Sequence, residues 1–175
     1  MALMLLLAAT SAQADWPANN TNLVKWLQGP DPTINGFDVL AGPGPQPGAP
    51  AIILANDFQC KKTGPITDIH LWTSWFGFNG STVVPPISIT LGIWTDVPAN
   101  GTVPSHPGTL LWTNTFNSGQ YKVRPWSSSD ERFWDPDPPP AGIILGPDNL
   151  IWQYNFYAPA ANTFTQTGSL TAPVT

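Results

Sequence analysis

The chain has 175 residues, a length suited to one domain with a substantial core. Its net charge is −5 with only six Lys and Arg residues, which argues against nucleic acid or an anionic membrane as a partner, because both need a basic surface. Proline (21) and glycine (15) are frequent, yet nine Trp and eight Phe exclude a disordered chain and predict many short strands joined by turns.

The first 14 residues are expected to be a signal peptide. Residues 3–9 are apolar, and the sequence AQA at 12–14 has the small side chains that signal peptidase accepts, so the mature domain is placed at 15–175. The apolar run is well short of the roughly 20 residues that span a membrane. We therefore expect a secreted or cell-surface protein, in which the single cysteine, Cys60, is a small buried apolar residue.

Strands separated by turns are predicted along the rest of the chain. Residues 41–50 and 135–142, rich in Gly and Pro, are predicted loops, because proline cannot donate to a sheet ladder. The sequence SHPG at 105–108 is predicted to be a turn. The predicted strands are AIILANDFQC (51–60), GPITDIHLWTSW (64–75), ISITLGIW (87–94), TLLWTNTF (109–116), QYKVRPW (120–126) and NLIWQYNFYAP (149–159).

Alternation within the second of these strands assigns its side chains to two faces. Ile69 and Leu71 lie on the more apolar face and are expected to point into the core. Asp68, His70 and Trp72 then lie together on the outer or rim face, where they are available for binding.

The third strand has the clearest alternation in the chain. Ile89, Leu91 and Ile93 are predicted to face the core, and Trp94 falls on the opposite, polar face. No segment has a convincing helical period. The chain is therefore expected to be all-β: a single antiparallel β-sandwich of jelly-roll type.

A series of short motifs resembles a domain family of unknown function that occurs in secreted bacterial proteins, often ones with PEP-CTERM-type sorting signals. The matching motifs are KWLQGPD (25–31), GFDV (36–39), ILANDFQC (53–60), GPITDIHLWTSW (64–75), ITLGIWTDVPA (89–99), SHPGTLLW (105–112), FWDP (133–136) and WQYNFYAP (152–159). The resemblance implies a secreted β-sandwich with no established activity. Members of that family continue into a strand similar to YWLDV, so a C-terminally truncated member is implied, lacking a final strand. An unpaired sheet edge is then expected, where another protein chain can add a strand.

No catalytic residue is predicted. A glycosidase needs two opposed carboxyl groups, but Glu131 is the only glutamate and several aspartates lie in turn sequences. His70 lies in mid-strand and is expected to bond to Asp68 or to a neighbouring strand, and no G-x-S-x-G motif occurs. A glycoside or other hydrolase is therefore the least favoured alternative.

No cofactor is predicted, and calcium is the one metal for which the chain offers ligands. Asp135 and Asp137 could contribute oxygen atoms to a structural Ca²⁺. Their loop lacks the EF-hand spacing, so a solvated acidic loop is the simpler interpretation.

Carbohydrate binding is the sharpest functional alternative. Sugars stack on exposed indoles, and Trp72 and Trp94 fall on the polar faces of their strands, where Asp68 and His70 could bond to sugar hydroxyls. Most of the nine tryptophans are nevertheless expected to be core or loop anchors. We therefore expect a secreted, non-enzymatic domain of a cell-surface or extracellular-matrix protein, structural or adhesive in role, whose partner is an extracellular polysaccharide or another chain.

Overall fold

The structure is a computed structural model that describes the chain in five stretches. These are residues 24–42, 51–76, 87–136, 142–147 and 149–169. The predicted signal peptide, Asp137 and the end of the chain lie outside them.

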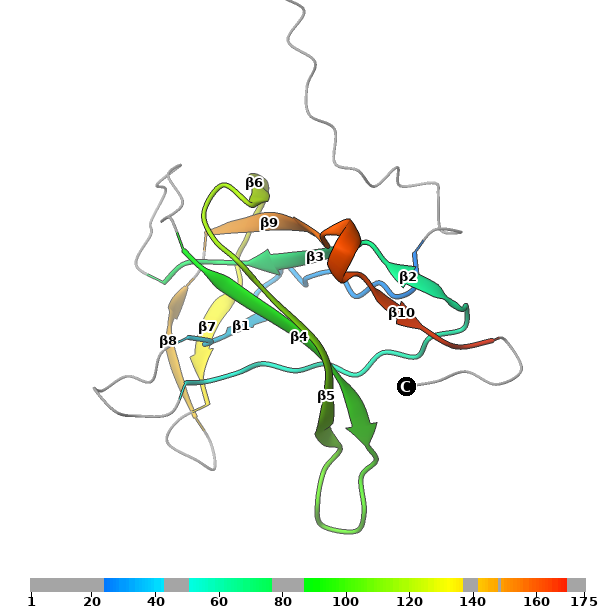
Figure 1. Cartoon of the computed structure of the whole chain (residues 1–175). Helices are drawn as coiled ribbons and strands as arrows, with labels where there is room; N and C mark the ends of the chain where they lie inside the picture. Colours follow the sequence, from blue (N-terminus) through cyan, green and yellow to red (C-terminus); the bar gives the residue numbers. More distant parts are fainter. Residues whose placement is uncertain (1–23, 43–50, 77–86, 137–141, 148, 170–175) are drawn as a thin grey trace, which may run out of the picture.

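All regular structure in these stretches is β-structure apart from one turn of 3-10 helix, so the predicted all-β class is confirmed (Figure 1). No helix in the described residues is long and apolar enough to cross a membrane. The elements are β1 (Phe37–Val39), β2 (Gly64–Ile66), β3 (Asp68–Thr73), β4 (Ile89–Val97), β5 (His106–Phe116), β6 (Tyr121–Ser128), β7 (Arg132–Asp135), β8 (Ile143–Pro147), β9 (Leu150–Tyr157), η1 (Ala160–Asn162) and β10 (Phe164–Gln166).

Two antiparallel layers enclose the main core. One is the sheet β3-β9-β6 with β9 in the middle, and the other is the hairpin of β4 and β5, here called the β4–β5 ribbon. Alternate side chains on each strand face the opposite layer, which buries large apolar surface without a disulfide. The buried side chains are Ile93, Trp112 and Phe116 from the ribbon and Trp152, Tyr154 and Phe156 from β9.

The predicted inward residues pack against this core. Ile69 and Leu71 do so from β3, and Ile89 and Leu91 from β4, beside the buried Ile93. The period-two assignments of these two strands are therefore confirmed.

The remaining strands form smaller sheets. β10 pairs with β2, and β1 runs parallel to β7, which pairs antiparallel with β8. The described residues thus form several short sheets, and the two main antiparallel layers pack face to face as in the predicted β-sandwich.

The stretch predicted as one strand over residues 64–75 changes its partner at Thr67. β2 pairs with β10 before this residue, and β3 pairs with β9 after it. The Thr67 carbonyl accepts a 2.8 Å hydrogen bond from the Ala158 amide, and η1 then separates β9 from β10. Two consecutive strands, β2 and β3, therefore belong to two different sheets (Figure 1).

Two other local predictions are wrong. Residues 51–60 form isolated bridges rather than a strand, and Ile53 is 77% exposed, although Cys60 is buried as expected. The sequence SHPG is not a turn, because β5 already begins at His106 and Pro107 lies opposite Asp96. A proline is tolerated there because the described part of the ribbon has two strands. The proline nitrogen, which has no hydrogen to donate, can therefore face an unpaired edge.

Tyr154 links the core to the chain beyond β3. Its hydroxyl oxygen accepts a 3.1 Å hydrogen bond from Trp75 Nε1. Burial of the side chain raises the pKa of Tyr154 to about 12, from an ordinary value of 10.0. The folded state therefore holds this proton more tightly than the unfolded state does.

We predict that the free energy of unfolding falls as the pH rises from about 10 towards 12, because the unfolded tyrosine ionises first. Tyr154→Phe removes this decline and lowers stability at pH 7 by about 1–3 kcal/mol, since the Trp75 N–H loses its acceptor. Urea unfolding of both proteins across this pH range measures the difference. Equal alkaline declines in the two proteins would contradict the prediction.

Candidate functional site

The side of the sheet β3-β9-β6 that faces away from the core carries most of the polar residues singled out in the sequence. Asp68, His70 and Trp72 share this face because Ile69 and Leu71 between them turn to the core. The structure therefore brings three of the four predicted ligand-binding residues together on β3.

A hydrogen-bonded row runs across this face from β3 through β9 to β6. His70 Nε2 lies 3.6 Å from Asp68 Oδ1, and His70 Nδ1 lies 3.2 Å from Gln153 Nε2. On the other side, Arg124 donates from Nε and Nη2 to Gln153 Oε1, at 3.0 and 2.6 Å. The row Asp68–His70–Gln153–Arg124 therefore joins all three strands.

The row also determines which nitrogen carries the single proton of His70 when the ring is neutral. Arginine only donates, so the Gln153 atom that it contacts is the amide oxygen and the other amide atom is the NH₂ group. That group donates to His70 Nδ1, which leaves the ring proton on Nε2, facing Asp68. Both ring nitrogens thus have protein partners, an arrangement suited to holding strands together.

The contacts of Asp68, at the end of the row, lower the pKa of its carboxyl group. The hydrogen bond from His70 holds the pKa of Asp68 below its ordinary value of 3.8, against the opposing effect of partial burial. Thr67 Oγ1 donates to the second carboxylate oxygen at 3.3 Å.

Two tryptophans lie beside the row. Trp72 on β3 and Trp126 on β6 meet edge to face, with ring centroids 6.2 Å apart and an interplanar angle of 73°. Trp126 is 40% exposed, whereas Trp72 Nε1 is buried with no partner among the described residues. In this pair the edge of one ring faces the other, so the two do not form one flat platform.

Trp94, the fourth predicted residue, lies on the other layer. Ile93 beside it points into the core, and Trp94 lies on the outer face of the β4–β5 ribbon with 37% of its surface exposed. The core thus separates Trp94 from Trp72, and the four residues do not form one surface.

The predicted calcium ligands do not form a described site. Asp135 ends β7, and Asp137 lies outside the described residues. No group of three or more His, Cys, Asp or Glu side chains in the described part of the chain is placed to hold a metal ion.

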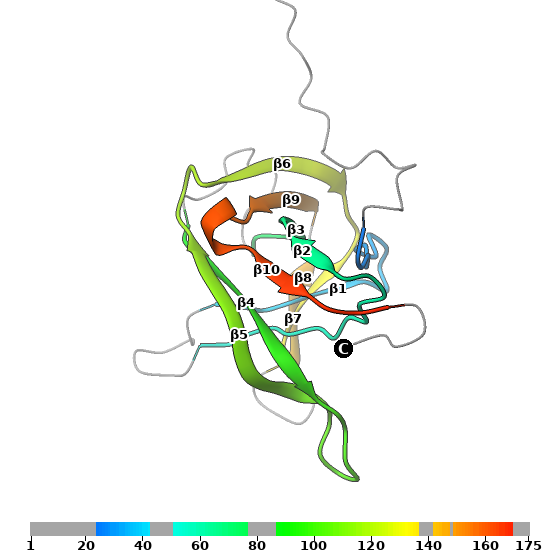
Figure 2. The ribbon, with the colours of Figure 1, turned by 45° about the vertical axis from the view of Figure 1, so that its right-hand side comes forward.

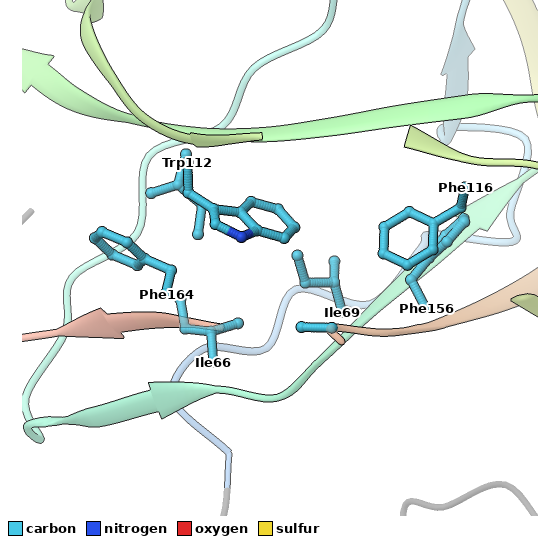
Figure 3. Close-up of a pocket in the computed structure, with 8 residues that line it drawn as sticks. Ile66, Ile69, Trp112, Phe116, Phe156 and Phe164 are labelled. Carbon is cyan, nitrogen blue, oxygen red and sulfur yellow. The ribbon is translucent and has the colours of Figure 1, made fainter. Parts of the chain in front are cut away.

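The pocket between the layers belongs to the core. Trp112 and Phe116 enter it from β5, opposite Ile66, Ile69, Phe156 and Phe164 (Figure 3). The remaining space has no room for a water molecule, and Trp112 Nε1 donates to the Asn162 carbonyl at 2.7 Å. The pocket is therefore a packing feature and offers no ligand site.

Sequence reasoning missed Gln153 and Arg124 as members of the polar face. The signal was present in the alternation, since Trp152 and Tyr154 face the core and Gln153 lies between them. What the sequence did not show is that β6 pairs with β9 in the register that puts Arg124 opposite Gln153.

The chain belongs to a family of unknown function. The family model described as "Domain of unknown function (DUF7901)" matches residues 24–171. The resemblance to a family without an assigned function is thereby confirmed, while bacterial origin and the sorting signal stay predictions. No curated protein and no solved structure matches the chain.

We predict that Gln153→Leu lowers the free energy of unfolding by about 2 kcal/mol, because Arg124 and His70 each lose a partner at a buried position. The matched change at the exposed end of the row, Asp68→Asn, costs less than about 1 kcal/mol. Urea unfolding followed by tryptophan fluorescence measures both values. A Gln153→Leu protein as stable as the wild type would show that the row does not hold the sheet together.

We also predict a specific acid sensitivity. A lowered folded-state pKa means that the contribution of Asp68 is complete above pH 3.8 and is lost as the pH falls below that value, through the folded-state pKa. The stability difference between wild type and Asp68→Asn should therefore shrink from pH 6 to pH 2. A constant difference in acid urea titrations would contradict this cause.

Proposed function

We propose that the chain is a non-enzymatic structural or adhesive domain of an exported cell-surface protein. The observation that carries this proposal is the outer part of the β4–β5 ribbon, which extends beyond the other strands (Figure 2). Surface loops and arms that carry apolar side chains away from a domain are typical contact elements.

The outer part of the ribbon carries exposed apolar side chains. Beyond the part of the ribbon that covers the core, the exposed fractions are 49% for Leu110, 47% for Leu111, 37% for Val97 and 51% for Val103. In the described part of the chain, β4 and β5 pair only with each other, which leaves their outer edges available to another strand. Such an edge supports pairing with a further chain.

The partner we propose is a second copy of this chain. Antiparallel pairing of one edge with its own copy about a two-fold axis is self-complementary. The net charge of −5 opposes contact between copies in general, but residues 87–116 contain Asp96 as their only carboxylate and no Lys or Arg. The ribbon is thus where two copies approach with least repulsion.

The polar face supports the non-enzymatic part of the proposal. His70 is held from both sides by Asp68 and Gln153, and its side chain is only 7% exposed. Glu131, the only glutamate, is 2% exposed. His70 and Glu131 are therefore held within the packed structure, which leaves them little access to a substrate.

Carbohydrate binding is the second candidate function. The observation that favours it is the exposed Trp94 indole, which lies on a ribbon whose residues 87–95 and 109–116 include no Asp, Glu, Lys or Arg. Binding of an extracellular polysaccharide would suit the same location at a cell surface.

We predict that the domain, displayed on cells that do not otherwise clump, causes clumping, and that Leu110→Lys abolishes it because two like charges would meet at the paired edge. Ser128→Lys, an equal change of charge at an exposed position on β6, is the matched control and should leave clumping unchanged. Light scattering on the purified mature domain should report dimers for the wild type and monomers for Leu110→Lys. A wild-type domain that is monomeric in solution, together with displaying cells that do not clump, would refute the proposal.

A further inference from the structure

The outer face of the β4–β5 ribbon combines one flat aromatic ring with a group of hydroxyls. Alternation places Thr90, Gly92 and Trp94 of β4 on this face, since Leu91 and Ile93 face the core. On β5, Thr113 and Thr115 face outward between the buried Trp112 and Phe116, and Leu110 lies directly opposite Trp94.

The Trp94 ring lies over Gly92. A Cβ atom at position 92 would collide with three atoms of the six-membered ring of Trp94, so the absence of a side chain at Gly92 is what lets the ring lie there. The six-membered ring therefore lies close against the ribbon at Gly92, and the residue is still 37% exposed, so part of its surface is open to solvent. An indole held in this way is a preformed stacking surface that loses little rotational freedom on binding.

Hydroxyl groups lie next to the ring. Thr113 is directly opposite Gly92, and Thr115 is directly opposite Thr90, two residues further along. Thr90 and Thr115 share a hydrogen bond of 2.8 Å between their Oγ1 atoms, and Thr113 Oγ1 donates to the Leu91 carbonyl at 3.1 Å. Each hydroxyl oxygen keeps capacity to accept from a ligand, and all three residues are exposed.

The charge of the surface selects the class of ligand. Residues 87–95 and 109–116 contain no Asp, Glu, Lys or Arg. Asp96, two residues beyond Trp94, is the one Asp, Glu, Lys or Arg between residues 87 and 116. An anionic polymer therefore finds no opposite charge here, whereas a neutral sugar presents C–H groups to the indole and hydroxyls to the threonines. The Trp72–Trp126 pair is less suitable, because it meets edge to face and has Arg124 on the same sheet face.

We propose that this face binds a neutral polysaccharide, with a pyranose ring stacked on the free face of Trp94 and its hydroxyls bonded to Thr113 and Thr115. The site gives a location and a ligand class to the second candidate function above. It uses the face of the ribbon and does not require the edge pairing proposed for self-association.

The test is affinity gel electrophoresis of the mature domain in gels containing xylan, mixed-linkage β-glucan or galactomannan, with polygalacturonate as an anionic comparison. At least one neutral polymer should retard the wild type, and the anionic polymer should not. Trp94→Ala should weaken binding roughly tenfold or more, and Thr113→Val should weaken it less. Trp126→Ala, an equally exposed tryptophan on the other layer, should bind as the wild type does.

Circular dichroism keeps the result interpretable, because Trp94→Ala must retain the wild-type spectrum and melting temperature to count. Should that variant unfold, the double variant Thr113→Val, Thr115→Val is tested in the same gels, and its binding to the neutral polymer should be weaker than that of the wild type. Retardation by none of the three neutral polymers, equal retardation by the anionic polymer, or undiminished binding by the folded variants would each overturn the proposal. Trp94→Ala should lose polysaccharide binding while still forming dimers in light scattering, because edge pairing uses backbone groups, so failure of this site and failure of self-association are told apart.

Discussion

The structure depends on the burial of β9 from both sides. Residues Ile151–Phe156 are all buried, and they alternate between an apolar face and a face that carries Gln153 and Asn155. The apolar face packs under the β4–β5 ribbon and supplies the core. A polar side chain buried on the opposite face is destabilising unless it forms hydrogen bonds within the protein, because water no longer reaches it. Asn155 Oδ1 has no such partner among the described residues. Gln153 forms its hydrogen bonds with Arg124 and His70, so the row across the sheet is a consequence of burying this strand.

This constraint explains why His70 and Gln153 are tied into hydrogen bonds across the sheet. Asp68, His70 and Trp72 are rich in chemical groups, but they lie on an edge strand of the sheet, next to buried β9. His70 serves the cross-strand network with both nitrogens. The ribbon has the opposite character, because only the part nearest β9 covers the core and the rest extends beyond the other strands (Figure 2) and carries exposed apolar residues. The ribbon therefore offers exposed surface that the outer face of β3 does not.

Several features of this arrangement were predictable from local pattern. The inward positions of Ile69 and Leu71 and the outward position of Trp94 follow from alternation, which each strand displays by itself. The joint placement of Asp68 and His70 follows in the same way. The SHPG sequence was misread because proline marks turns on average, and only the ribbon's open edge lets Pro107 lie inside β5.

The sequence by itself determined the class of the fold and the face on which each strand residue lies, because both depend on periodicity over a few neighbouring residues. Tertiary structure decided which faces meet. The pairing of Arg124 with Gln153 joins residues 29 positions apart, and the separation of Trp94 from Trp72 results from the packing of two different layers. These relations depend on strand order and register. Both are set by the packing of the whole chain and cannot be inferred from any single segment.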